Sequence, residues 1–269
     1  MNYLVFDIET VPDVALGRRL FPLDHLSDED AAKAMTFRHL QQSGSEFLPL
    51  HQHRIVAISF VARRGDSLKV SSFGDAESSE ADLVSNFFDA IEKVTPELVS
   101  WNGNDFDLPV LHYRALLHGI AAPRYWEMGD NDRSFNYNNY LNRFHWRHID
   151  VMDALAGFNN RARAKLDTIA VMLGYPGKMG LGGDKVWGYY LDGQLDAIRN
   201  YCETDVLNTY LVFLRFQHMR GVIDNVELGD EQARVRDLLS ASTKEHFKEF
   251  LDAWGEAGHS DGLPVESGT

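Results

Sequence analysis

The sequence predicts an α/β protein in which a mixed five-stranded sheet is flanked by helices. Two observations carry this prediction. The chain begins with apolar and β-branched runs joined by a hairpin signal, and later short apolar runs alternate with segments of helical periodicity. Strands that first meander and then alternate with helices give antiparallel pairs followed by parallel crossovers. A functional site is expected where strand ends meet helix starts.

Five segments have the composition of strands. The run from Tyr3 to Ile8 is almost wholly apolar, which is typical of a strand buried on both faces. The second and third segments enclose Arg63-Arg64-Gly65-Asp66, a hairpin signal, and the last two are short apolar runs beside helical patterns. The five predicted strands are residues 3–8, 54–62, 68–73, 97–101 and 148–152.

Helices are predicted where apolar residues recur three and four positions apart. The segment between Val11 and His53 lies outside the main pattern, and there Ser27 opens a capping-box sequence for a helix that reaches about Gln42. We therefore expect an ordered insertion at about 11–53. The other predicted helices cover residues 80–94, 108–118, 165–173 and 195–220.

The C-terminal part, residues 221–269, is predicted to be a helical extension of a main domain spanning 1–220. One amphipathic helix is expected from about Asp230 to Trp254. The residues after Gly255 are rich in Gly and Ser and acidic, which predicts a disordered tail.

The composition is that of an ordinary globular protein, with 269 residues, 44% of them apolar and 25% charged. Cys202 is the single cysteine and lies in no zinc-ligand pattern, which favours a reducing compartment. We see no signal peptide at the start and no apolar run long enough to span a bilayer. A cytoplasmic protein without a membrane partner is therefore expected.

The formal net charge of −14 argues against a partner that is itself a polyanion. The distribution of charge weakens this objection, because residues 221–269 contain eleven acidic and four basic side chains. Four further acids form the candidate metal site described next, where divalent ions would reverse the sign of the local charge.

Two of the candidate acids lie on the first predicted strand. Asp7 and Glu9 flank Ile8, so their side chains point to the same face of the sheet. Asp107 follows at a strand-to-helix junction, where irregular backbone presents side chains well. Singly, these acids have ordinary interpretations: a strand end that reaches solvent, and a helix N-cap.

The third group lies within the last predicted helix of the main domain. Tyr201 and Asp205 are four residues apart and share one helical face. Four carboxylates in one place suit phosphodiester hydrolysis, since two divalent ions about 3.5–4 Å apart activate water and stabilise the phosphoryl group. Such acids repel one another without cations, and hard cations prefer carboxylate oxygens. Tyr201 is then placed to orient the attacking water.

These residues resemble a known family. Phe6-Asp7-Ile8-Glu9-Thr10, Asn102 through Phe106-Asp107, and Tyr201-Cys202-Glu203-Thr204-Asp205 resemble the three motifs of the DEDDy exonucleases, in particular those of the proofreading exonuclease domain of family-B DNA polymerases and of stand-alone bacterial proteins predicted to be related to it. The likeness also includes Leu166-Asp167, Leu173-Gly174 and Lys178, and extends over about residues 3–215.

The resemblance implies a ribonuclease-H-like fold and an exonuclease domain over residues 1–220. It also implies that Asp7, Glu9, Asp107 and Asp205 bind two magnesium or manganese ions and that Tyr201 assists the nucleophile. The histidine branch of this superfamily has its histidine where this chain has Asn200, so the tyrosine branch fits. Substrate contacts are expected at Thr10, Asn102, Phe106 and Lys178.

The predicted function is a 3′–5′ exonuclease that acts on single-stranded or frayed 3′ ends, with DNA favoured over RNA, and releases nucleoside 5′-monophosphates. The alternatives are an exoribonuclease of the same superfamily and a catalytically silent module that binds strand ends or a repair partner. An aspartyl phosphatase is disfavoured because Glu9 stands where a second aspartate is needed. The sequence leaves protein partners undetermined.

Weaker signals remain open. Aromatic residues between Phe135 and Trp146 stand beside Arg133, Arg143 and Arg147, a combination that stacks bases in some proteins but more often forms core. The glycine-rich loop 177–185 lacks phosphate-loop spacing. Asp150 and Asp153 rank below the motif acids, and His51, His53 and His148 show no metal-site spacing.

Overall fold

The computed structural model describes residues 1–180 and 182–260. Its centre is one five-stranded sheet, whose strands are β1 (Asn2–Pro12), β2 (His53–Arg64), β3 (Ser67–Ser72), β4 (Glu97–Ser100) and β5 (His148–Asp150). The order across the sheet is β3-β2-β1-β4-β5. β2 runs antiparallel to β1 and β3, whereas β4 and β5 run parallel to β1. This is the ribonuclease-H-like mixed sheet that the sequence predicts.

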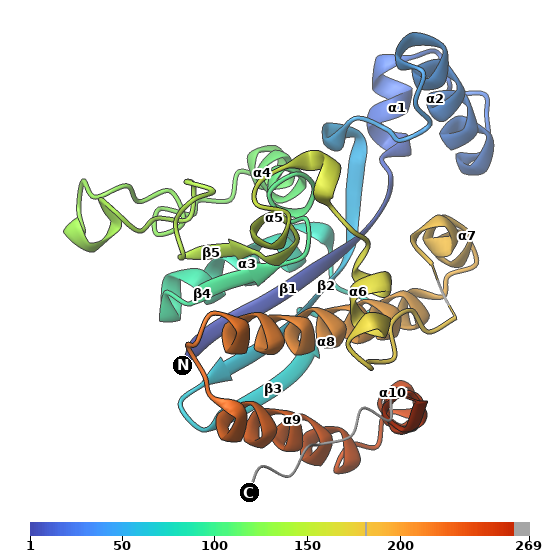
Figure 1. The fold of residues 1–269 in the computed structure, drawn as a ribbon. Coiled ribbons are helices and arrows are strands. Elements are labelled where there is room, and N and C mark those ends of the chain that lie inside the picture. The colour runs from blue at the N-terminus through green and yellow to red at the C-terminus, as the bar shows by residue number, and fades with distance from the viewer. Residues whose placement is uncertain (181, 261–269) are drawn as a thin grey trace, which may run out of the picture.

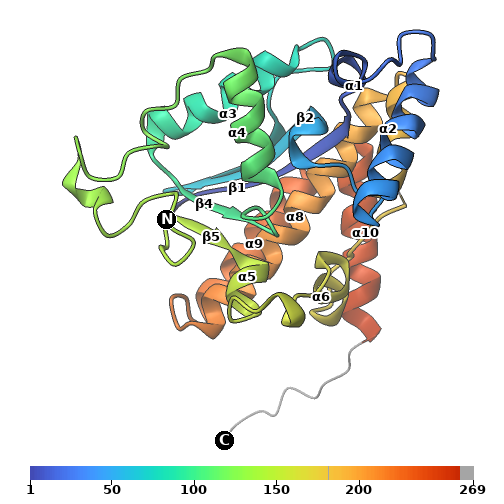
Figure 2. The same ribbon diagram turned by 90° about the horizontal axis from the view of Figure 1, so that it is seen from above.

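Helices cover both faces of the sheet. α3 (Glu80–Val94) and α4 (Asp107–His118) pack on one face, and α8 (Leu195–Met219) packs on the other, with α9 (Asn225–Ser240) beside it (Figures 1 and 2). The remaining α-helices are α1 (Val14–Leu20), α2 (Asp28–Ser43), α5 (Val151–Leu155), α6 (Leu166–Met172), α7 (Val186–Leu191) and α10 (Glu245–Ser260).

The two faces of β1 belong to different cores. Leu4, Phe6 and Ile8 are buried in the cluster formed with α3 and α4, whereas Val5 is buried in the cluster formed with α8. Side chains alternate along a strand, so the odd-numbered residues of this segment face α8. The sequence pattern of β1 therefore determines which helix the acids of the first motif meet.

The insertion is ordered and helical. α1 and α2 lie together beyond the C-terminal end of β1, above α7 in the view of Figure 1. Ser27 is the N-cap of α2, and its side chain accepts a hydrogen bond from the Asp30 amide, as the capping sequence predicts. α1 is not predicted from its short sequence; the Asp13 side chain caps it by accepting from the Leu16 amide.

The prediction of a single C-terminal helix is wrong, because α9 ends at Ser240 and α10 begins at Glu245. The chain turns between them, and the side chains of Lys244 and His246 reach Glu203 on α8. Residues 256–260 continue α10 rather than beginning a tail, and the rest of the predicted tail lies outside the described residues. Within the described chain, no helix combines the length and apolarity needed to cross a membrane.

Candidate active site

The first motif lies where β1 loses one neighbour. β4 pairs with β1 only through Tyr3, Leu4 and Val5, so the following residues of β1 have a free edge on that side. Asp7 is half-buried and Glu9 is buried, and both point to the face that α8 covers. The end of the β4 pairing therefore leaves room for side chains from other segments beside Asp7 and Glu9.

Asp107 lies beside β1 just beyond the point where the pairing with β4 ends. Its Oδ1 accepts a hydrogen bond of 3.2 Å from the Ile8 amide, so the second motif is held directly on the backbone of the first. Asp107 is the first residue of α4, whose N-cap position is occupied by Phe106 without a side-chain hydrogen bond. The interpretation of Asp107 as an ordinary N-cap is therefore wrong, and its buried carboxylate is available to the site.

The third motif comes from α8. Tyr201 is buried and Asp205 is partly exposed, and the two side chains lie close enough for each to shift the pKa of the other. Between them, the thiol of Cys202 donates to the backbone oxygen of Asp7 at 3.4 Å and lies 3.5 Å from its Oδ2. This contact fixes α8 against β1 next to the acids.

The four acids lie close enough to perturb one another. Burial raises the pKa of Asp7 well above its ordinary value, and the charges of Asp107, Glu9 and Asp205 raise it further. Burial and the charges of Asp205 and Asp107 do the same for Glu9. Burial raises the pKa of Asp107 to about 7 and that of Asp205 to about 6. The three motifs thus form one acidic cluster of Asp7, Glu9, Asp107 and Asp205.

Lys178 is the cation that acts on this cluster. Its charge lowers the pKa of both Glu9 and Asp205. The loop that carries it is fixed at Gly177, whose amide and carbonyl bond to the Asn208 side chain at 3.2 and 2.8 Å. Gly177 has a φ of +65°, and a Cβ there would approach Asp167 Oδ1 to 2.6 Å, so a larger residue would displace the loop.

Two hollows open beside the acidic cluster. One, of about 580 Å³, is lined by Tyr201 and Asp205 together with Asn102 and Lys178, two of the predicted substrate contacts. The other, of about 820 Å³, is lined by Glu9 and the insertion together with Thr10 and Phe106, the other two. Each hollow is therefore lined by two of the four predicted substrate contacts.

Asp150 and Asp153 have a role that the sequence analysis missed. Asp150 accepts hydrogen bonds from the backbone amides of Asn102 and Asn104, both at 3.0 Å, and so fixes the loop that leads to Asp107. Asn102 needs this support because its φ is +67°, a left-handed conformation. Asp150 also caps α5, which explains why β5 ends there and not at Met152. The only sequence signal is an aspartate at a strand end.

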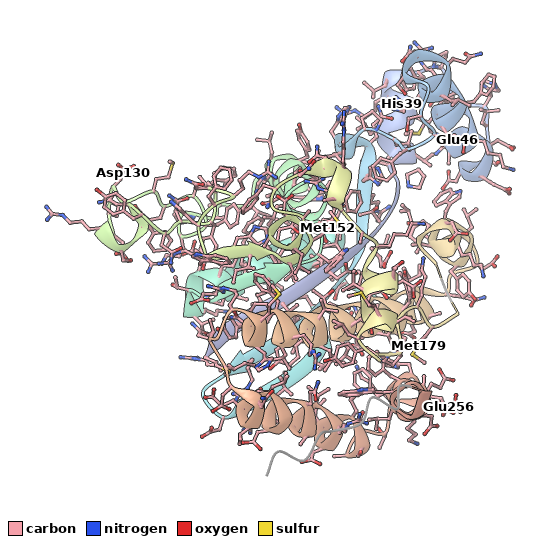
Figure 3. The ribbon with its side chains drawn as sticks, in the orientation of Figure 1. His39, Glu46, Asp130, Met152, Met179 and Glu256 are labelled. Atoms are coloured by element: carbon pink, nitrogen blue, oxygen red, sulfur yellow. The ribbon has the colours of Figure 1, made fainter. Side chains whose placement is uncertain are left out.

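The weaker candidates lie apart from the cluster or have structural partners. Phe135 and Tyr140 are buried core residues, and Arg147 packs 3.9 Å from the Phe135 ring centre. Asp130, which precedes this segment, lies at the opposite side of Figure 3 from Glu46 of the insertion. His148 bonds Ser100 at 2.8 Å. These contacts support the core interpretation for Phe135 and Tyr140, whereas Tyr137, Phe144 and Trp146 are exposed.

The donor set of the cluster fits hard divalent cations. The ligand atoms of Asp7, Glu9 and Cys202 lie within 4.8 Å of one another. Burial raises the pKa of the Cys202 thiol, which remains a protonated hydrogen-bond donor, so the available ligands are carboxylate oxygens. Among the side chains that the structure describes, no ion pair neutralises any of the four acids. Bound cations would neutralise the negative charge of these acids.

Comparison with known proteins gives a family and similar solved structures. Residues 45–254 match the family described as a predicted 3′–5′ exonuclease related to the exonuclease domain of PolB. The match includes Asp107, Tyr201 and Asp205, and it begins after Asp7 and Glu9. The family B DNA polymerase from the hyperthermophilic archaeon Pyrobaculum calidifontis is similar with a TM-score of 0.47 and 15% identity, over 81% of this chain and 24% of the polymerase. The chain thus spans about a quarter of that polymerase. No curated protein sequence matches the chain.

Proposed function

The chain belongs to the family of predicted 3′–5′ exonucleases related to the exonuclease domain of PolB, and from that premise we propose that it is a metal-dependent 3′–5′ exonuclease. It hydrolyses the terminal phosphodiester bond of single-stranded or frayed DNA and releases nucleoside 5′-monophosphates one at a time. The observation that carries this proposal is the convergence of four acids and a tyrosine from three distant segments. They are Asp7, Glu9, Asp107, Asp205 and Tyr201.

In this proposal the four acids hold two magnesium or manganese ions. When bound, such ions stabilise charge on the transferring phosphoryl group and promote ionisation of the attacking water. The donor chemistry supports this assignment, because hard cations select carboxylate oxygens. The raised pKa values of Asp7 and Glu9 support it as well, since they record a repulsion that bound cations would relieve.

The hydrolysis transfers a phosphoryl group to water. A water oxygen attacks the phosphorus, the bond between phosphorus and O3′ breaks, and O3′ becomes the new 3′-hydroxyl of the shortened strand after accepting a proton. Burial raises the pKa of Tyr201, and the nearby charges of Asp205 and Glu9 raise it further. Tyr201 therefore stays protonated at neutral pH and cannot be the base. It orients the attacking water through its hydroxyl.

We assign the terminal nucleotide to the hollow of about 580 Å³ beside Tyr201 and Asp205. Lys178 lines this hollow, where its ammonium group meets the charge of the phosphate. Asn102 lines it as well and offers a side-chain amide to the sugar or base. The preference for DNA follows from the likeness of the three motifs to a DNA polymerase exonuclease.

We further place this activity in DNA repair or processing in the cytoplasm. The compartment is supported by Cys202, which is buried as a free thiol. A thiol beside the catalytic acids remains reduced in such a compartment.

The test follows 5′-labelled single-stranded DNA and RNA of the same sequence, with magnesium, with manganese and with chelator. We expect a ladder that shortens stepwise from the 3′ end, requires metal, and is lost in Asp7→Asn. Asp130→Asn is the matched control, because Asp130 is an exposed acid far from the site. Shortening of RNA alone would replace DNA by RNA as the substrate. Absence of cleavage with both metals, or equal cleavage by Asp7→Asn, would refute the proposal.

A further inference from the structure

The groove between the insertion and the acidic cluster has a volume of about 820 Å³. One end is at Glu9 and Thr10 on β1, so the groove opens on the acids themselves. One wall is α2 together with the segment that follows it, and Trp187 at the start of α7 closes the groove against α2. The insertion therefore forms one wall of a channel that leads to the site.

Exposed aromatic side chains follow this channel. Phe37 on α2 is 59% exposed and Phe47 is 58% exposed, although both line the groove. The Phe47 ring lies 5.1 Å from the ring of His53 and 5.7 Å from that of Phe106. Phe106 directly precedes Asp107. A row of rings thus runs from the insertion to the residue next to a catalytic acid.

The charge of the groove is opposite to that of a phosphate-binding surface. Among the described residues that line it, the acidic and basic side chains are those of Glu9, Lys33, Glu46 and Asp184. Lys33 is already paired with Glu29 at 2.6 Å. Binding that depends on phosphate needs several free lysines or arginines. Exposed rings, in contrast, hold single strands by stacking on unpaired bases.

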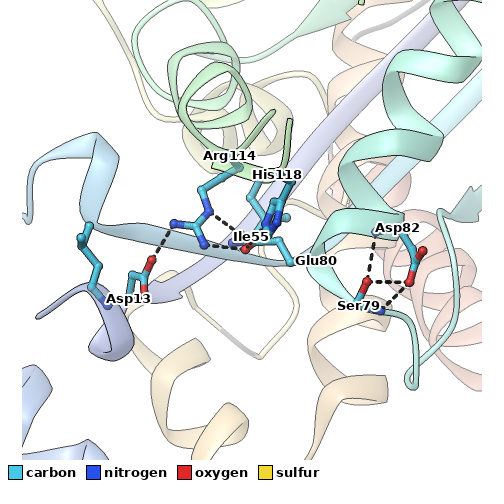
Figure 4. A network of polar contacts seen from close by, with 8 residues as sticks. Asp13, Ile55, Ser79, Glu80, Asp82, Arg114 and His118 are labelled. Atoms are coloured by element: carbon cyan, nitrogen blue, oxygen red, sulfur yellow. Dashed lines mark hydrogen bonds and ion pairs between the residues drawn. The ribbon is translucent and has the colours of Figure 1, made fainter. Parts of the chain in front are cut away.

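The wall of this groove is held in place by a buried ion network. Arg114 on α4 bonds Asp13, the N-cap of α1, at 2.6 Å, and bonds Glu80 on α3 at 2.7 and 2.5 Å (Figure 4). His118 and the Ile55 amide also form hydrogen bonds with the Glu80 carboxylate. The base of the insertion is therefore attached to the two helices that cover the sheet, and the groove exists before any strand enters it.

We propose that the insertion is a single-strand clamp, in which Phe37 and Phe47 stack the unpaired bases that lie behind the terminal nucleotide. The occupant is a single nucleic-acid strand, because a duplex buries the base faces that the rings require. This inference rests on the proposed function, since it assumes that the acids cleave the end of that strand. It adds that the protein holds the strand by stacking on its bases rather than by ionic contacts with its phosphates.

The test compares a small substrate that contacts only the acidic cluster with a longer one that also extends into the groove. A p-nitrophenyl ester of thymidine 5′-monophosphate occupies the acidic cluster alone, whereas an oligothymidylate of about twelve nucleotides also fills the groove. We expect Phe37→Ala and Phe47→Ala each to lower kcat/KM for the oligonucleotide at least about five-fold more than for the ester, and Phe47→Trp to retain most of the activity. Tyr137→Ala is the control, because Tyr137 is 90% exposed in the segment away from the groove.

Binding gives a second measurement that needs no hydrolysis. Anisotropy of the labelled oligothymidylate in calcium is expected to show weaker binding by both alanine variants and a shallow dependence on salt. Equal binding by wild type and both variants would overturn the clamp, and so would a steep salt dependence that the variants leave unchanged. Failure of wild type to cleave the ester with either metal would refute the exonuclease, while the binding data would still decide for or against the clamp.

Discussion

Two buried groups of acids in this molecule differ in one respect, the presence of a partner. Asp13 and Glu80 are both buried, and the guanidinium of Arg114 bonds each of them. Asp107 and Glu9 are buried to a similar degree, and no ion pair to either occurs in the described chain. Asp13 and Glu80 connect elements of the fold through Arg114, whereas the acids of the cluster repel one another.

This difference shows which buried charges stabilise the folded state and which destabilise it. A buried charge that has a partner is costly to disturb, because removing the partner leaves the charge desolvated and alone. Buried charges without partners make the folded state less stable until a cation arrives. Substitutions in the two groups should therefore have opposite consequences: loss of activity in the acidic cluster and loss of stability in the arginine network.

The largest effect is expected from Asp107→Asn. Loss of one carboxylate from the proposed metal site should lower kcat/KM by about a thousandfold or more, equivalent to several kcal/mol of transition-state stabilisation. Stability in chelator should stay equal or rise, because one of the repelling charges is gone and asparagine still accepts from the Ile8 amide. Strand-shortening rates and urea unfolding would measure the two quantities. A large loss of stability in chelator would contradict the comparison.

Arg114→Met should have the opposite profile. It leaves Glu80 and Asp13 buried without their cation, and we expect a loss of about 3–5 kcal/mol in the free energy of unfolding. Arg18→Met is the control, since its ion pair is with an exposed Asp28 and should contribute about 1 kcal/mol or less. Urea denaturation of the three proteins is the measurement. Equal stability of both variants would show that the Arg114 network does not hold the fold.

Metal addition should stabilise the wild type through the acidic cluster. Magnesium or manganese at about a hundred times its dissociation constant contributes about 2.7 kcal/mol, which corresponds to a rise in Tm of several degrees. Asp7→Asn should show a smaller rise, because it removes one of the proposed ligands. Thermal unfolding in metal and in chelator measures the difference. An equal rise in both proteins would place the metal elsewhere.

The smallest effect is expected from the share of Asp205 in the pH dependence of stability in chelator. Burial raises the pKa of Asp205 from 3.8 to about 6, so the folded state binds a proton more tightly than the unfolded chain does. The contribution of this group to stability is therefore present at low pH and is lost as pH rises from about 4 to 6. The effect should be on the order of 1 kcal/mol, because Asp205 is partly exposed and solvent screens the repulsion. Asp205→Asn should flatten this slope in urea unfolding curves.

Local signals predict the elements of this fold well. Ser27 and the residues after it predict the start of α2, and Gly65 with its neighbours predicts the β2–β3 turn, because capping and turn chemistry involve adjacent residues. The break between α9 and α10 is not predicted. It depends on Lys244 and His246 reaching Glu203 some forty residues earlier, a contact that periodicity does not contain.

The site shows the same division. The three motifs predict that their acids converge, and the structure brings them together. The support of the site is not predicted: Asp150 fixes the loop of Asn102 across a separation of 48 residues, which no local pattern reveals. The aromatic groove is hidden for a similar reason. Phe37 and Phe47 belong to an insertion whose position against β1 is set by the folded chain.

The distribution of the motifs along the chain also determines when the acidic cluster can first form. During synthesis, a chain that has emerged as far as β5 contains Asp7 and Asp107 but lacks Asp205 and Tyr201, which come with α8. Domains fold as units, and α8 contributes to the core on its face of the sheet. The acidic cluster therefore cannot be complete before α8 has been synthesised, and the proposed nuclease activity would begin only then.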